Sequence, residues 1–219
     1  MSRRSRIVSF SLVVIAAGLL LASLKLPLWQ MRMEAPQYRD EEALKIAVHP
    51  NALRGDLREL TVLESYIGVH IPPTLPQFKW LPGTLIAGAI LGLVAGLLPL
   101  AIRRRALIVL VVALAAVFGV AAVQAVNQMH DIGHHRDQHT PLVGVKDFTP
   151  PFLGTTKIAQ FEVSSRFGWG AWLIGVALTL QLGAAWLSRN SKTFVAANVS
   201  RLKHSTVKVA SRPTPAATP

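Results

Sequence analysis

Hydrophobic residues gather in four long runs without a charged residue, and polar positions fill the segments between them. The runs cover residues 7–24, 81–102, 106–128 and 167–188. A helix needs about 20 apolar residues to cross the roughly 30 Å of hydrocarbon in a bilayer, at 1.5 Å rise per residue. The pattern therefore predicts four transmembrane helices, over residues 7–28, 83–102, 106–126 and 169–188.

The segments between the runs differ in charge. They are an N-terminus at 1–6, loop 1 at 29–82, a turn at 103–105, loop 2 at 127–168 and a tail at 189–219. Twelve basic residues and no acidic residue lie in the two ends and the turn, whereas all 11 Asp and Glu lie in the loops. The positive-inside rule places both ends and the turn in the cytoplasm, and both loops outside it.

Composition agrees with a multi-pass protein of the lipid bilayer, since 51% of the residues are hydrophobic and the mean hydropathy is +0.41. The net charge of +12 is explained by topology and lipid headgroups, and without an aromatic-studded basic surface we expect no nucleic-acid binding. The first run is interpreted as an anchor, because no A-x-A cleavage site follows it. Tryptophans at the predicted helix ends indicate an aromatic belt: Trp29, Trp80, Trp169, Trp172 and Trp186.

Both loops carry signals of a small subdomain. Residues 44–48 alternate as a strand does, and residues 57–67 have helical spacing between Asp56 and Gly68. Residues 158–163 alternate enough for a second strand, which we expect to pair with the first. The predicted fold class is an all-α membrane protein, a four-helix bundle whose two extracytoplasmic loops form a small α+β subdomain.

Small and polar residues within the runs bear on packing and transport. Gly88, Gly92 and Gly96 recur every four residues, which favours close approach of another helix, although glycine is common in membrane helices. No ionisable residue lies deep in a run, which disfavours channels, pumps and carriers. A polar cavity between the helices, lined by Gln124 and Gln181, would instead favour a small-solute carrier.

Histidines are the strongest candidates for chemistry. If the third helix continues outward, His130 and His134 share one face at i,i+4 spacing, which suits two imidazole ligands on one Cu or Zn ion. The alternative is a polar helix end with solvated histidines, where Gly133 breaks the alignment. The candidate metal ligands are His134, His130, Asp137, His135, His139 and Asp131.

Other chemistry finds less support. Met31, Met33 and Met129 are soft enough for Cu(I), but gap-filling near the membrane interface is favoured for them. The chain has no cysteine, which excludes disulfides and thiolate sites. It also lacks a G-x-S-x-G elbow, a P-loop and a G-x-G-x-x-G fingerprint, so we do not expect an enzyme.

Short motifs occur in one order over residues 26–187: Leu28-Trp29-Gln30, Ala35-Pro36-Gln37-Tyr38, Gly55-Asp56, Leu63 with Tyr66-Ile67-Gly68, Gly133-His134 with Asp137, Pro150-Pro151 and Gly168-Trp169-Gly170. In these motifs the chain resembles an uncharacterised family of four-helix membrane proteins encoded in bacterial nitrous-oxide-reductase gene clusters. The resemblance implies a protein of the bacterial inner membrane that acts in periplasmic copper handling or reductase maturation. It also implies copper as a cofactor and a periplasmic copper protein as a partner.

The chain departs from that family at one motif. The family reads Asn-His before Tyr-Ile-Gly-Met, whereas here Glu64-Ser65 precede Tyr66 and Val69 replaces the methionine. Both soft ligands of that motif are missing, so His134, in the retained Gly133-His134 motif, is the leading candidate.

Two functions remain open. One is an accessory membrane protein for copper handling or for maturation of a periplasmic copper enzyme. The other is a non-catalytic docking subunit of an envelope complex, although the same apolar loop residues suit a small core packed over the bundle. The residues predicted to contact a partner are Trp29, Pro36, Tyr38, Tyr66, Gly68, Pro150 and Pro151.

Overall fold

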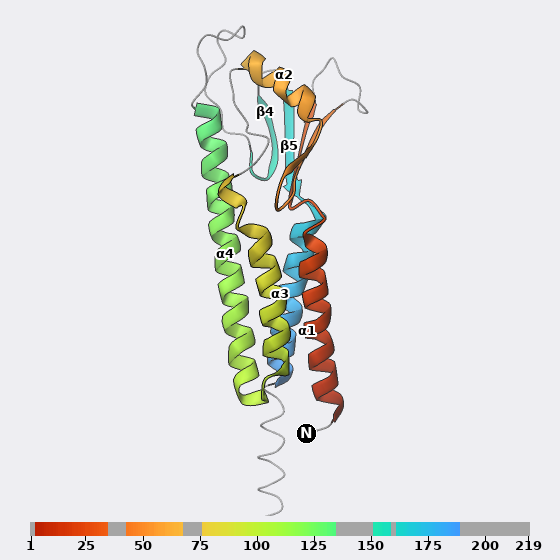
Figure 1. Ribbon diagram of the computed structural model, residues 1–219. Helices are drawn as coiled ribbons and strands as arrows, with labels where there is room; N and C mark the ends of the chain where they lie inside the picture. Colours follow the sequence, from red (N-terminus) through yellow and green to blue (C-terminus); the bar gives the residue numbers. More distant parts are fainter. Residues whose placement is uncertain (1–2, 35–42, 68–75, 135–150, 159–160, 189–219) are drawn as a thin grey trace, which may run out of the picture.

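The computed structural model describes residues 3–34, 43–67, 76–134, 151–158 and 161–188. Four of its helices form one bundle, with a sheet at one end (Figure 1). They are α1 (Arg3–Ser23), α3 (Leu81–Leu97), α4 (Leu100–His134) and a last helix over Trp169–Ser188, drawn in blue. All four are long and apolar enough to cross a membrane. By length and composition the chain is therefore a multi-pass membrane protein, as the hydrophobic runs predict.

Helix α3 packs closely against three neighbours through its row of glycines. A Cβ added at each glycine would meet a side chain of a different helix: Leu114 of α4 at 3.0 Å from Gly88, Gln181 of the last helix at 3.2 Å from Gly92, and Val13 of α1 at 3.1 Å from Gly96. Larger residues at these positions would push the helices apart. The predicted close packing along this row is confirmed.

The turn between α3 and α4 lies earlier than the predicted turn at 103–105. Helix α3 ends at Leu97 and α4 begins at Leu100, so two residues join them. Pro99 has no N–H and cannot continue α3, whereas its carbonyl accepts the Arg103 N–H at 2.9 Å and starts α4. The three arginines therefore lie within α4. That helix has 35 residues where about 20 cross a bilayer, so its far end stands beyond the bundle (Figure 1).

Five of the described segments outside the bundle form an antiparallel sheet in the order β3-β2-β1-β5-β4. Its strands are β1 (Trp29–Glu34), β2 (Leu44–Val48), β3 (Leu53–Gly55), β4 (Gly154–Ile158) and β5 (Phe161–Phe167). The predicted strand at 44–48 is confirmed. Residues 158–163 are not one strand, because Ile158 and Phe161 pair across a β4–β5 hairpin. Strand β5 pairs with β1. A strand of loop 2 therefore pairs with a strand of loop 1 as predicted, but the predicted partner, the strand at 44–48, is wrong.

Helix α2 (Leu57–Ile67) lies on the apolar face of the sheet and confirms the predicted helix. Asp56 ties its start to β2, since the Asp56 N–H donates to Lys45 O at 3.1 Å and its carboxylate accepts from Lys45 N–H at 2.9 Å. Gly68, the predicted end of the helix, lies outside the described residues. The helix packs on the sheet through Leu60, which clusters with Leu44, Ile46 and Leu53.

A pair of hydrogen bonds fixes the sheet on the bundle. Strand β1 follows α1 after a short connection, and β5 leads directly into the last helix. Between these connections, the N–H groups of Gly168 and Gly170 donate to Leu28 O and Pro27 O, at 2.9 and 2.8 Å. A Cβ added to Gly168 would overlap the Pro27 carbonyl. Only glycine permits this approach of the two backbones.

We expect Gly168→Ala to lower the free energy of unfolding by about 2 kcal/mol or more, because the methyl group forces the Pro27 backbone away and weakens both bonds. The measurement is the thermal unfolding midpoint in detergent. The matched control is Gly183→Ala, where an added Cβ meets no atom within 4 Å. Equal midpoints for the two variants would contradict the role of this junction.

Candidate functional site

The predicted histidine cluster begins at the end of α4, which continues through Gly133 to His134. The rings of His130 and His134 stack, with centroids 3.9 Å apart and planes at 11°. His134 Nδ1 lies 2.8 Å from His130 O, so Nδ1 is the protonated donor and the Nε2 lone pair remains for another partner. The predicted alignment of these two histidines is confirmed, and the expected helix break at Gly133 is wrong.

The stacked rings do not converge on one ion. The lone pair of an imidazole lies in the ring plane, so parallel rings direct their lone pairs side by side. His130 Nδ1 lies 3.9 Å from Asp131 Oδ1, and the two side chains are 58% and 64% exposed. Within the described ranges, no group of three or more His, Cys, Asp or Glu is placed to hold a metal. The other predicted ligands, His135, Asp137 and His139, lie outside those ranges.

The methionines lie in apolar surroundings. Met31 and Met33 share one face of β1 and pack against the cluster around Leu60. Met129 of α4 lines the same cavity as Met31. These contacts agree with gap-filling rather than with an exposed soft-metal site.

The residues predicted to contact a partner are scattered in the described part of the chain. Trp29 is only 8% exposed, and its indole N–H donates to Phe152 O at 2.6 Å, so its predicted place in the aromatic belt is wrong. Pro151 is half-buried, and Tyr66 lies in α2. The remaining predicted contacts lie outside the described residues: Pro36, Tyr38, Gly68 and Pro150.

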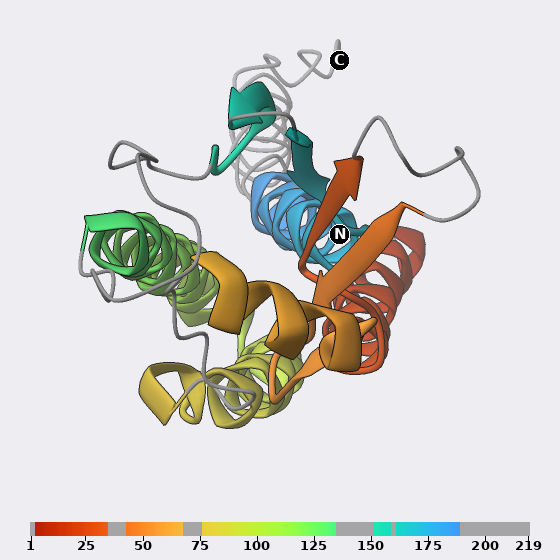
Figure 2. The same cartoon turned by 90° about the horizontal axis from the view of Figure 1, so that it is seen from above.

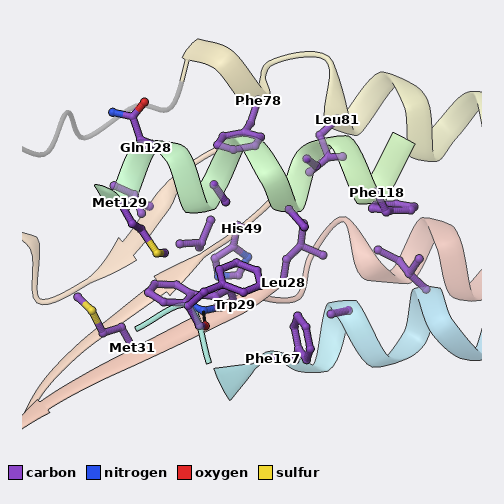
Figure 3. A pocket seen from close by; sticks show the side chains of 18 of the residues that line it. Leu28, Trp29, Met31, His49, Phe78, Leu81, Phe118, Gln128, Met129 and Phe167 are labelled. Atoms are coloured by element: carbon purple, nitrogen blue, oxygen red, sulfur yellow. Dashed lines mark hydrogen bonds between the residues drawn. The ribbon is translucent and has the colours of Figure 1, made fainter. Parts of the chain in front are cut away.

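A cavity of about 650 Å³ lies between the sheet and the bundle (Figure 3). The apolar face of the sheet forms one wall and the outer half of α4 the opposite wall, while α2 crosses above them (Figure 2). Phe78 of the 3₁₀ turn η2 (Pro76–Phe78) closes one side, and Ile174 and Leu178 of the last helix lie toward the bundle. The described residues of the lining are almost entirely apolar, and the polar groups among them are His49, Gln128 and the indole N–H of Trp29.

Sequence reasoning missed this cavity and the strand β1. The signal for β1 was the strict alternation of apolar and polar residues over 29–34. The signal for the cavity was weaker, a group of small residues on the face of α4 that lines it: Gly119, Ala121, Ala122 and Ala125.

The opposite face of the sheet is polar. Two contacts organise it: Arg32 Nε lies 2.6 Å from Glu34 Oε1, and Arg166 Nε donates to Gln30 Oε1 at 3.3 Å. Among the strand residues that the structure describes, five basic and two acidic side chains leave an excess of three positive charges on this face. We call it the charged sheet face, and the strand register assigns to it Gln30, Arg32, Glu34, Lys45, Arg54, Lys157, Glu162 and Arg166.

His49 follows β2 at the cavity wall, where its backbone N–H donates to Ala52 O at 2.9 Å. Burial lowers the pKa of His49, and the positive charge of Arg54 lowers it further. The imidazole is therefore neutral at pH 7 and adds no charge to the apolar lining.

Fold and surfaces together define a class of protein, a four-span membrane protein with a five-stranded sheet mounted on one end of its bundle. No model of a known protein family matches the chain, and no curated protein is found to be similar to it. The resemblance to the four-helix family of nitrous-oxide-reductase gene clusters stays a prediction from the motifs.

The lowered pKa of His49 predicts a loss of stability in acid. Its folded-state pKa lies below its unfolded value, so the unfolded chain takes up more protons as pH falls, and stability present at neutral pH is lost. The thermal midpoint of the protein should fall between about pH 7.5 and about pH 5.5. The fall should be smaller in His49→Gln, because an amide does not titrate. An equal fall in both proteins would contradict the assignment.

Proposed function

We propose that this chain is a non-catalytic accessory protein of the membrane that docks an acidic envelope protein on its charged sheet face. The observation that carries the proposal is the division of the sheet into two unlike faces. One face is apolar and forms the wall of the cavity, whereas the other is exposed and carries a positive excess. On this second face, the described side chains of Lys45, Arg54, Lys157, Glu162 and Arg166 are exposed and can contact a partner.

The distribution of arginine supports an orientation with the sheet outside the cytoplasm. Arg6, Arg104 and Arg105 are exposed near the end of the bundle opposite the sheet. By the positive-inside rule that end belongs in the cytoplasm. The motif resemblance implies the bacterial inner membrane, and in that membrane the sheet faces the periplasm.

Charge and rigidity together favour docking. A positive surface attracts an acidic partner over several ångströms and discriminates against basic ones. The surface is built on strands whose backbone is fixed by the hydrogen bonds at Gly168 and Gly170, so little ordering of the backbone opposes binding. The partner implied by the motif resemblance is a periplasmic copper enzyme or one of its maturation proteins.

Charge reversal tests the docking surface. Tagged full-length chain is cross-linked in membranes of its source cells, and partners are identified by mass spectrometry. We expect Lys45→Glu with Lys157→Glu to lower recovery of an acidic partner at least about tenfold, and added salt to lower it as well. Arg58→Glu with Lys79→Glu reverses two exposed charges off the sheet and should leave recovery unchanged.

A separate labelling experiment checks on which side of the membrane the sheet lies. The chain has no cysteine, so Lys157→Cys introduces a single thiol that a membrane-impermeant maleimide should label in intact spheroplasts. A chain recovered without any partner, or a partner lost equally in both double variants, would contradict the docking proposal.

Copper binding is a second candidate, and the hydrogen bond of His134 favours it. Metal-ligating histidines commonly donate their second ring N–H to a carbonyl, as His134 Nδ1 does to His130 O. The described residues fit a metal only after a ring turns, and His130, which is exposed, has room to do so. The proposal concerns binding of the ion alone.

Titration of detergent-solubilised protein with Cu(I) and Cu(II) tests this candidate. We expect about one ion per chain, and His134→Ala should weaken binding at least about tenfold. His49→Ala, which removes a histidine of the cavity wall, is the control. A stoichiometry far below one, unchanged by His134→Ala, would remove copper from the function.

A further inference from the structure

We propose that the cavity between the sheet and the bundle holds the hydrocarbon chain of a membrane phospholipid, drawn from the leaflet on the sheet side. This site is separate from the charged sheet face, because the two lie on opposite sides of the same strands. It is also separate from the stacked histidines, which do not line the cavity.

The space exists because small residues face it from two helices. Helix α4 contributes a glycine and three alanines to the wall, and the last helix contributes Ala171 and Gly175. A Cβ added to Gly119 or Gly175 would meet no atom within 4 Å. An apolar space of about 650 Å³ falls in the range of volumes that small-molecule sites have in proteins, and apolar linings are typical of such sites.

The lining selects hydrocarbon over water. A buried water needs two to four polar partners, and apolar cavities without them stay dry and bind hydrocarbons. The indole N–H of Trp29 is already bonded to Phe152 O at 2.6 Å. Of the described residues that line the wall, His49 and Gln128 then remain as polar side chains, too few to hold a cluster of water or a charged ligand.

The mouth of the cavity faces the bilayer. Phe167 and Trp172 line the cavity and yet are 44% and 62% exposed, and Gly119 and Gly175 are exposed as well. Three of these four residues belong to helices that are apolar enough to cross a membrane, and Gly168 alone separates Phe167 from the last helix. The opening therefore lies at the depth where α4 and the last helix meet lipid chains, so a chain can enter sideways without crossing water.

Photolabelling with a phospholipid tests this site. The full chain is reconstituted in phosphatidylethanolamine and phosphatidylglycerol vesicles that contain a phospholipid with a diazirine on its acyl chain. After illumination, mass spectrometry should find label on Ile46, a sheet residue only 4% exposed, and on Ala122 of the opposite wall. Lipid outside the cavity cannot reach Ile46, so this residue reports occupancy.

Filling variants decide the outcome. Gly175→Leu should lower labelling of Ile46 about tenfold, because the new side chain displaces about two methylene groups of the lipid. Gly183→Leu is the matched control, since its Cβ also meets open space but does not line the cavity. Label on Val109, which is 67% exposed, should stay constant in both.

A second filling variant, Ala122→Phe, blocks the cavity from α4 and replaces Gly175→Leu if that protein does not fold. Absence of label from Ile46 in the unmodified chain would overturn the proposal. So would labelling of Ile46 that persists in a folded filling variant.

Discussion

The structure outside the bundle depends on the backbone hydrogen bonds between Gly168–Gly170 and Pro27–Leu28. Backbone groups at the ends of membrane helices need partners where water is scarce, and here two chain segments supply them to each other. The junction starts β1 beside β5 with Trp29 opposite Phe167. A shift of one residue would turn every side chain to the other face, so the apolar wall and the charged sheet face both follow from this register.

Within the bundle, helix α3 holds the other three helices together. Its glycines admit side chains from α1, α4 and the last helix, and α1 also contacts the last helix through the Ser9 hydroxyl, which donates to Ala184 O at 3.1 Å. Gln181 is fully buried against Gly92, whereas Gln124 is exposed on α4, and neither lines the cavity. The pair of glutamines that would have favoured a carrier is therefore not assembled.

Patterns of hydrophobic and polar residues correctly predicted the elements whose formation depends on neighbouring residues. Hydropathy located four spans, and periodicity located α2 and β2, because burial of one face decides these elements within a few turns or pleats. The prediction failed where the partner is distant. Whether β5 pairs with β1 or β2 depends on where α1 and the last helix leave the bundle, which no window of sequence contains. The turn lies earlier than the three arginines predict, because Pro99 ends α3 before them and the arginines continue as α4.

In the candidate sites too, features set by neighbouring residues were predictable, and features set by distant contacts were not. Alignment of His130 with His134 follows from helical spacing and was predictable, whereas the stacking of their rings is set by side-chain rotation. The cavity required segments far apart in the sequence to be brought together, among them the sheet, α4 and the last helix. Trp29 illustrates the difference, since its position at a helix end suggested lipid contact, yet the fold turns it inward to Phe152.

The strand order also has a consequence for how the protein is made. Gln30 and Arg166 touch in the sheet although 136 positions separate them along the chain. A ribosome releases β1, β2 and β3 early, so the edge of β1 that later receives β5 must wait until α3, α4 and loop 2 have been synthesised. An unpaired strand edge is a template for wrong partners during that interval. Biogenesis of this protein therefore includes a vulnerable period that ends only when the hairpin of β4 and β5 emerges.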